Sequence, residues 1–171
     1  MNISLAQAVS SVNIISKQIS KLQRDLKNVA FQTINKSEAL EDQEETFYDV
    51  YGKLSEAESD LIELKLVIRT VNQAETLAWD DQDVSIGKAI ELSKLLRSQA
   101  KTLANYGSNR KKEAVNSYSN PEPRFQIAMF DPKAVSDQAA ALERKADRLS
   151  ALIEARNHSI NIDLPFMEKY L

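Results

Sequence analysis

Two long stripes of apolar residues run through the first half of the chain. Apolar residues recur at alternating spacings of three and four over residues 5–29 and again over 47–71. This heptad spacing is typical of helices that pack along a seam. The sequence therefore predicts an antiparallel helical hairpin over residues 1–72, with a polar connection at 31–42. The stripes are Leu5, Ala8, Val12, Ile15, Ile19, Leu22, Leu26 and Val29, then Phe47, Val50, Leu54, Ala57, Leu61, Leu64, Ile68 and Val71.

Both predicted helices also carry apolar residues away from these stripes. A seam between two helices does not bury such residues, so they indicate a third helix or a second subunit against the hairpin. We therefore expect a homo-oligomer. Gly52 lies inside the second helix, where glycine costs about 1 kcal/mol relative to alanine; it either marks a close helix contact or is tolerated. The residues away from the stripes are Val9, Ile14, Tyr48, Tyr51, Ile62 and Val67.

The start of the first helix and the two helices of the second half have recognisable end signals. Ser4 and Gln7 have the spacing of a capping box, which places the first helix at about residues 4–30. Residues 72–84 read as a loop, and Ser85 is the expected cap of a third helix. That helix is predicted to end near Gly107, with this glycine in the left-handed conformation. A last apolar stripe runs over residues 135–153.

The segment between the third and the last helix is the longest irregular stretch that the sequence predicts. Pro121 and Pro123 exclude a helix through residues 108–126. The weak alternation at 125–130 leaves open a short strand, and with it a small β-hairpin. Asp131-Pro132 is a strong start signal for the last helix. The tail after that helix is apolar, so we expect it to pack against the rest of the protein.

The predicted fold is therefore all-α, a coiled-coil-like bundle of about four long antiparallel helices in a single domain over residues 1–171. Within it we distinguish the helical hairpin at 1–72, the third helix with the irregular loop at 73–131, and the final helix with its tail at 132–171. The N-terminus lacks the basic and apolar regions of a signal peptide, and no apolar run is long enough to span a membrane. We expect a cytoplasmic protein.

The amino-acid composition excludes several kinds of catalytic and ligand-binding site. The chain has 3 Gly, 4 Pro, no Cys and 1 His in 171 residues. The widely spaced glycines cannot build a phosphate-cradling loop or a dinucleotide fingerprint. Without cysteine there is no thiol nucleophile and no thiolate zinc site. The lone His158 has no orienting partner at a typical spacing. We therefore expect no cofactor, no metal site, no catalytic residue and no enzymatic activity.

Charge is unevenly distributed along the chain. The net charge of the whole chain is −3, whereas residues 37–83 hold fourteen acidic and three basic side chains. Residues 1–36 are basic, which suggests that the first two helices attract one another. The acids from Glu41 to Glu45 match the preference of carboxylates for a helix N-terminus.

A second basic region covers residues 94–124, with seven basic and two acidic side chains. Tyr106, Tyr118 and Phe125 are interleaved with the basic residues. Cations beside aromatic rings can hold a phosphate-bearing ligand, a nucleotide or a nucleic acid. We favour the simpler interpretation of a solvated face that pairs with the acidic second helix. The candidate ligand-binding residues are Arg97, Lys101, Arg110, Lys111, Lys112 and Arg124.

Three segments together resemble the septicolysin-like family of small helical bacterial proteins. They are the opening helix ISLAQAVSSVNIISKQISKLQRDL, the run Ile68-Arg69-Thr70-Val71-Asn72, and the helix with Leu95-Leu96-Arg97 followed by a loop, a strand and an Asp-led helix. The run at 68–72 is similar to the family's I-N-R-T-N motif, with Arg69 in place of Asn and Val71 in place of Thr. The resemblance marks Arg69, Thr70 and Asn72 as the motif region. The family name implies a membrane-active toxin.

Three functions follow from these patterns. The leading hypothesis is a non-enzymatic oligomeric interaction or scaffold protein, whose partner is itself or another protein. The alternative is an oligomeric binder of a nucleotide or nucleic acid through residues 94–124. The weakest is a membrane-active toxin, because the charge-rich helices contain no membrane-inserting segment.

Overall fold

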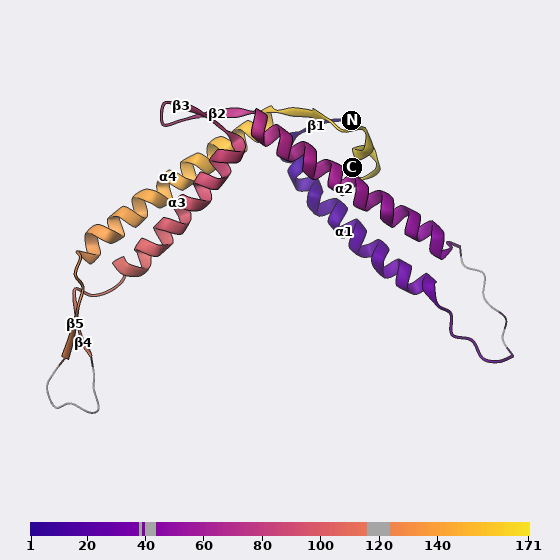
Figure 1. Cartoon of the computed structure of the whole chain (residues 1–171), viewed down its shortest axis with the longest axis horizontal. Coiled ribbons are helices and arrows are strands. Elements are labelled where there is room, and N and C mark those ends of the chain that lie inside the picture. Colours follow the sequence, from indigo (N-terminus) through magenta and orange to yellow (C-terminus); the bar gives the residue numbers. More distant parts are fainter. Residues whose placement is uncertain (38, 40–43, 116–123) are drawn as a thin grey trace. The chain divides into compact units, whose positions relative to one another are not determined.

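A computed structural model describes residues 1–37, 39, 44–115 and 124–171. Over these residues the protein is mostly helical, with four long helices and three short antiparallel strand pairs (Figure 1). Contacts between Cα atoms divide the chain into two compact units, Met1–Ala74 with Ala155–Leu171, and Glu75–Glu154. Each unit is described by itself. Folding of the whole chain as a single domain stays a prediction. The helices are α1 Leu5–Ala30, α2 Phe47–Ala74, α3 Ile86–Gly107 and α4 Pro132–Ser159.

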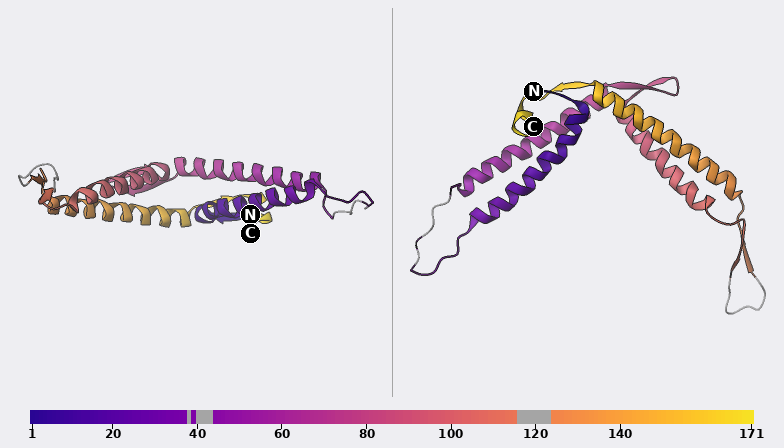
Figure 2. Two further views of the ribbon diagram at one scale, coloured as in Figure 1. Left: turned by 90° about the horizontal axis from the view of Figure 1, so that it is seen from below. Right: turned by 180° about the vertical axis from the view of Figure 1, so that it is seen from behind.

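The first unit is built on the antiparallel hairpin of α1 and α2 (Figure 2). Residues of both predicted stripes pack against one another between the two helices. Among the ion pairs of the described residues, none joins α1 to α2. One stretch of the seam consists of buried Leu22, Val50, Leu54 and Ala57 with Ile19, Leu26 and Val29 packed against them.

The capping box predicted for α1 is present. The Gln7 backbone N–H donates to Ser4 Oγ at 3.1 Å, and the Ser4 backbone N–H donates to Gln7 Oε1 at 2.8 Å. These bonds satisfy donors that the first turn of a helix leaves unpaired. Ser4 is also the last residue of strand β1, Asn2–Ser4.

The C-terminal tail docks on the first unit, as the sequence predicts. Strand β6, Asn161–Asp163, pairs antiparallel with β1, and Ile3 lies opposite Ile162. The short 3-10 helix η1, Pro165–Lys169, follows and buries Met167 completely. Leu164 is also buried, and its N–H donates to the carbonyl of Met1 at 2.9 Å.

The last residues of the tail are anchored to α2 by the buried carboxylate of Asp60. The Tyr170 hydroxyl donates to Asp60 Oδ2 at 2.8 Å, and Lys169 Nζ donates to the same oxygen at 3.3 Å. Lys169 also forms an ion pair with Glu56. Burial, and secondly the bond to Asp60, raises the pKa of the Tyr170 hydroxyl. The tail thus covers the side of α2 that carries Glu56 and Asp60.

The second unit begins with a β-hairpin where the sequence predicted a loop over residues 72–84. Strand β2, Thr76–Trp79, pairs with β3, Gln82–Ser85, across a two-residue turn. The turn residues Asp80 and Asp81 have φ angles of 48° and 61°. Two-residue hairpins need positive φ at both positions, for which Asn-Gly is the common signal. Asp-Asp is a weak version of that signal.

Helices α3 and α4 lie side by side in the second unit (Figure 2). Ser85 caps α3 as predicted, because its hydroxyl accepts the N–H of Lys88 at 3.2 Å. In the interior, the hydroxyls of Ser93 and Ser150 are hydrogen-bonded at 2.9 Å. The buried apolar residues of the two helices are Ile86, Ala89, Leu96 and Ala100 of α3, and Ala139, Ala146 and Leu149 of α4.

The expectation that Gly107 ends α3 in the left-handed conformation is wrong. Gly107 is the last helical residue, and no described glycine has positive φ. Its role is steric instead. A Cβ atom at position 107 would lie 2.7 Å from the backbone nitrogen of Ser136 in α4. Glycine is needed here because α4 approaches α3 too closely for a side chain.

A third strand pair lies between α3 and α4 along the chain, within the stretch expected to be irregular. Strand β4, Lys112–Val115, pairs antiparallel with β5, Arg124–Ile127. This confirms the short hairpin that the sequence left open, whereas Tyr118, Pro121 and Pro123 lie outside the described residues. Asp131 caps α4 as expected, since its Oδ1 accepts the N–H of Lys133 at 3.0 Å. No described helix is both long enough and apolar enough to cross a membrane.

Candidate functional site

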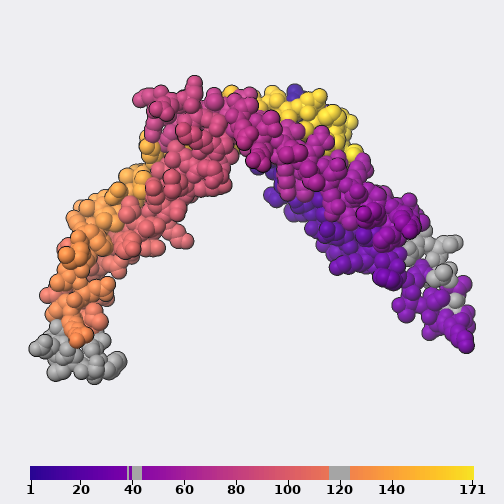
Figure 3. All heavy atoms as spheres, in the orientation of Figure 1, coloured from indigo at the N-terminus to yellow at the C-terminus, as the bar shows by residue number. Residues whose placement is uncertain are grey.

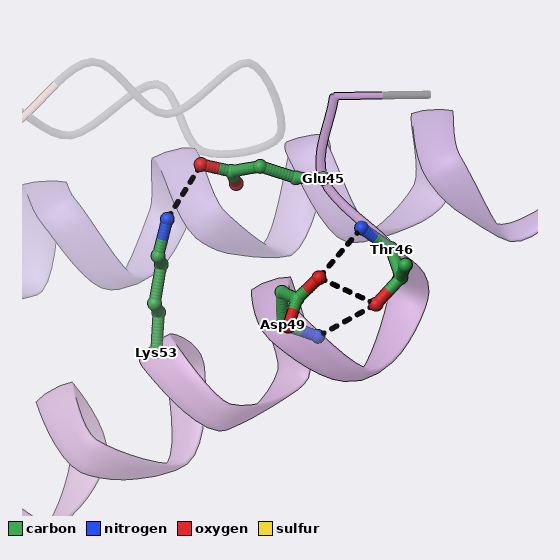
Figure 4. Close-up of polar contacts among 4 residues, drawn as sticks. All are labelled: Glu45, Thr46, Asp49 and Lys53. Carbon is green, nitrogen blue, oxygen red and sulfur yellow. Dashed lines mark hydrogen bonds and ion pairs between the residues drawn. The ribbon is translucent and has the colours of Figure 1, made fainter. Parts of the chain in front are cut away.

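The start of α2 is fixed by polar contacts around Thr46 and Asp49 (Figure 4). The Thr46 N–H donates to Asp49 Oδ2 at 2.9 Å, and the Asp49 N–H donates to Thr46 Oγ1 at 3.2 Å. Lys53 pairs with Glu45 at 2.5 Å. The helix therefore begins after Thr46, past the acidic run expected to start it. Of that run, Glu41, Asp42 and Gln43 lie outside the described residues.

The cap makes the stability of the chain depend on pH. Hydrogen bonds from the hydroxyl and then the N–H of Thr46, with the Lys53 charge as a smaller cause, lower the pKa of Asp49. The stabilisation is present above the unfolded-state pKa of about 3.9 and is lost as the pH falls through the lower folded value. We expect Asp49→Asn to lower stability near neutral pH, and this loss to shrink as the pH falls below about 4 and through the lower folded-state pKa. Urea denaturation at several pH values measures it.

Thr46→Ala is the matched control for this prediction. Without the Thr46 hydroxyl the main cause of the lowered pKa of Asp49 is gone. Asp49→Asn should then change the stability less in the Thr46→Ala background than in the wild type. An equal loss in both backgrounds, or one that persists unchanged in acid, would contradict this explanation.

The side of α2 away from α1 carries an uncharged stripe, which we call the outer face. Its residues recur at spacings of four and three, and all of them are exposed. The exposed fraction is 81% for Tyr48, 62% for Ile62 and 57% for Leu66. Figure 3 shows α2 at the surface of the first unit. The outer face consists of Tyr48, Gly52, Ser55, Ser59, Ile62 and Leu66.

Gly52 lies in this face, and no contact among the described residues requires a glycine there. A Cβ atom at position 52 would have no heavy atom within 4 Å. The close helix contact that the sequence left open is therefore absent within the described residues. Glycine weakens the helix by about 1 kcal/mol relative to alanine. Ser55 and Ser59, one and two turns further on, are also small, so the middle of the outer face is shallow.

The two ends of the outer face differ in chemistry. At the start of α2, the ring of Phe47 lies 5.6 Å from that of Tyr48 and 6.3 Å from that of Tyr51. On the helical wheel, Lys65 and Arg69 share the flank of Phe47 and Tyr51 at the other end of α2. Neither cation forms an ion pair in the described part of the chain. The helix thus has exposed aromatic rings at one end and exposed cations at the other.

Arg97, the first candidate ligand-binding residue, is engaged in helix packing. Its guanidinium donates to Ser93 Oγ at 3.0 Å, to Ser150 Oγ at 2.9 Å and to Asp147 Oδ1 at 3.2 Å. Since Ser93 is buried, these bonds satisfy a polar group in the interface of α3 and α4.

The other five candidate cations are not gathered around one cavity. Lys111 Nζ donates to the carbonyls of Ala128 and Phe130 at 2.8 and 2.7 Å, and so secures the base of the β4–β5 pair. Lys112 Nζ lies 4.0 Å from the centre of the Phe125 ring. The remaining three are exposed, with Lys101 on α3, Arg110 just after it and Arg124 on β5.

A groove of about 620 Å³ in the second unit involves other residues. It lies between the β2–β3 turn and α4, and Trp79 forms part of its wall. Lys145 of α4 pairs with Asp80 at 2.7 Å and lies 5.6 Å from the centre of the Trp79 ring. Sequence reasoning missed this groove because it did not predict the hairpin. Its lining is Ala78, Trp79, Asp80, Asp81, Arg148, Ala151 and Leu152.

The motif region of the family resemblance lies in the last turns of α2. Arg69 and Thr70 are exposed, and Asn72 is half-buried. His158 lies exposed near the end of α4. Among the described residues, no cluster of three or more acidic, His or Cys side chains is placed to hold a metal ion.

No protein-family model matches this chain, and no curated protein matches it. The fold is similar to a crystal structure titled as that of a functionally unknown conserved protein from Corynebacterium diphtheriae. The two chains are 17% identical, and the match has a TM-score of 0.68 over 95% of this chain and 100% of that one. Similarity at this identity shows the fold alone.

Proposed function

We propose that this chain is a non-enzymatic helical interaction protein that assembles with copies of itself through the outer face of α2. The observation that carries the proposal is the exposure of Tyr48, Ile62 and Leu66 on one uncharged stripe of a long, well-packed helix. Fully burying an Ile or Leu side chain contributes about 1.5–3 kcal/mol. A second copy would bury these residues on both partners.

Other sides of α2 already have neighbours within the first unit. The seam faces α1, and the side with Glu56 and Asp60 contacts Lys169 and Tyr170 of the tail. The outer face is the apolar side left open. Its lack of charge favours a partner surface that is also uncharged, which a copy of the same stripe supplies.

Binding of a phosphate-bearing ligand has weaker support. Three of the six candidate cations, Arg97, Lys111 and Lys112, already contact other groups of the chain. The other three lie on different elements. An electrostatic site needs several free cations converging on one anion, whereas the outer face needs only a second α2.

Ile62→Glu tests the proposal, because it replaces a large apolar residue of the outer face by a charge. A charge buried at an interface without a partner is costly. We expect self-association to weaken at least about tenfold, as measured by sedimentation equilibrium of wild type and variant. The matched control is Leu95→Glu, since Leu95 is 53% exposed on α3, outside the outer face. Equal effects of the two variants, or none from Ile62→Glu, would overturn the proposal.

A further inference from the structure

We infer that the assembly is a two-fold dimer in which the outer faces of two α2 helices pack antiparallel, with the two-fold axis at the level of position 57 along the helix. This inference rests on the proposed function and adds the direction and the register of the contact. It follows from the order of large and small residues along the outer face, from the open space at Gly52, and from the opposite chemistry of the two ends of the helix.

The outer face is self-complementary when its direction is reversed. Residues at equal distances before and after position 57 face one another in an antiparallel pair with a two-fold axis. Tyr48 then meets Leu66 of the partner subunit, and Ser55 meets Ser59 of the partner subunit. Gly52 meets Ile62 of the partner subunit. Each of these six positions is exposed and uncharged in the chain itself.

The pairing of Gly52 with an isoleucine explains the glycine. Helices pack with side chains of one seated in spaces of the other. Position 52 offers such a space, since nothing in the described chain lies within 4 Å of a Cβ built there. Ile62 is 62% exposed and is a side chain that can fill it. The small Ser55 and Ser59 let the two helix backbones approach closely at the centre.

The ends of the helix select the antiparallel direction. An antiparallel pair brings Lys65 and Arg69 of the partner subunit alongside the aromatic rings of Tyr51 and Phe47, where a cation is attracted by a ring face. A parallel two-fold pair would instead set this flank against the opposite flank of the partner, so the cations and the aromatic rings would not meet. The antiparallel arrangement has one like-charge contact, because Glu58 lies close to the two-fold axis on the same flank.

Cysteine cross-linking reads the direction directly, since the chain has no cysteine of its own. A disulfide requires Cα atoms within about 7 Å. In the proposed register Ser55→Cys faces Ser59→Cys of the partner, while two Ser55→Cys chains are offset by four residues, about 6 Å along the axis. We expect a mixture of the two variants to form disulfide-linked dimers under mild oxidation. Each variant alone should form few.

Two outcomes overturn this inference without touching the proposed function. Rapid linkage of Ser55→Cys with itself would indicate parallel helices in register, or an antiparallel pair shifted along the helix, and either contradicts the inference. A dimer that links in neither experiment, but is still weakened by Ile62→Glu, would contradict this register. A chain that stays monomeric at every concentration overturns the proposed function itself, so the two failures are distinguishable.

Gly52→Ala and Glu58→Gln give a second, independent test. Gly52→Ala should weaken the dimer at least tenfold while leaving the helix content of the monomer equal or higher, because the added methyl group obstructs only the partner's Ile62. Glu58→Gln should strengthen the dimer. Ser59→Ala, a small residue for a small residue in the same face, is the matched control and should leave the affinity within about threefold. A dimer unaffected by Gly52→Ala contradicts the register.

Discussion

Met167→Ala is expected to lower the free energy of unfolding by about 2–5 kcal/mol, the range for removing most of a buried methionine side chain. Met167 is completely buried in η1, in the tail that is joined to the N-terminus by the β1–β6 pairing. The missing side chain leaves a cavity that the short 3-10 helix can close only in part. Urea denaturation followed by circular dichroism measures the loss.

Met129→Ala is the matched control for this prediction. Met129 is 93% exposed, so its truncation should change the free energy of unfolding by less than about 0.5 kcal/mol. Similar losses for the two variants would contradict the docked tail. A loss confined to Met167→Ala shows that the last residues belong to the core of the first unit.

Gly107→Ala is expected to destabilise the chain by about 1–3 kcal/mol, the usual cost of overpacking. Its new methyl group would lie 2.7 and 2.8 Å from the backbone nitrogen and Cα of Ser136. Backbone atoms cannot move aside as the end of a flexible side chain can. The strain should therefore separate the end of α3 from the start of α4, and thermal or urea denaturation would detect it.

Gly52→Ala makes the same chemical change in open space. It should raise the free energy of unfolding of the monomer by up to about 1 kcal/mol, because alanine has the higher helix propensity. The comparison needs protein dilute enough to be monomeric. If both substitutions stabilise, the close approach of α3 and α4 at Gly107 is wrong.

The helices were predictable because their stripes are long and their caps are local. Ser4, Ser85 and Asp131 all cap the helices that the sequence assigned to them. The hairpin of β2 and β3 was not predictable at the same level. Its strands have four residues each, and its turn uses Asp80 and Asp81 where glycine or asparagine is the common signal.

The residues of the candidate sites also differ in how far the sequence could predict their surroundings. Tyr48, Tyr51 and Ile62 are visible in the sequence as residues away from the seam, and the structure shows them exposed. Arg97 was a candidate for ligand binding, although a solvated basic face was favoured, because the sequence records only that a cation is present. Its bonds to Ser150 and Asp147 depend on the packing of α4 against α3, which joins residues about fifty positions apart.

The surroundings of Gly52 could not be predicted from the sequence either. From the sequence alone, a helical glycine that contacts a neighbouring helix cannot be distinguished from one that faces solvent. The open space at position 52, together with the crowding at position 107, separates the two cases. Of these two glycines, only Gly52 has open space beside it for a partner.

The mass of the unmodified chain as a function of concentration tests the central claim most directly. Light scattering or sedimentation equilibrium should give a mass that rises from 19.2 kDa toward twice that value across the micromolar range. Ile62→Glu should remain at the mass of one chain under the same conditions. A wild-type mass of 19.2 kDa at every concentration would contradict self-association through the outer face of α2.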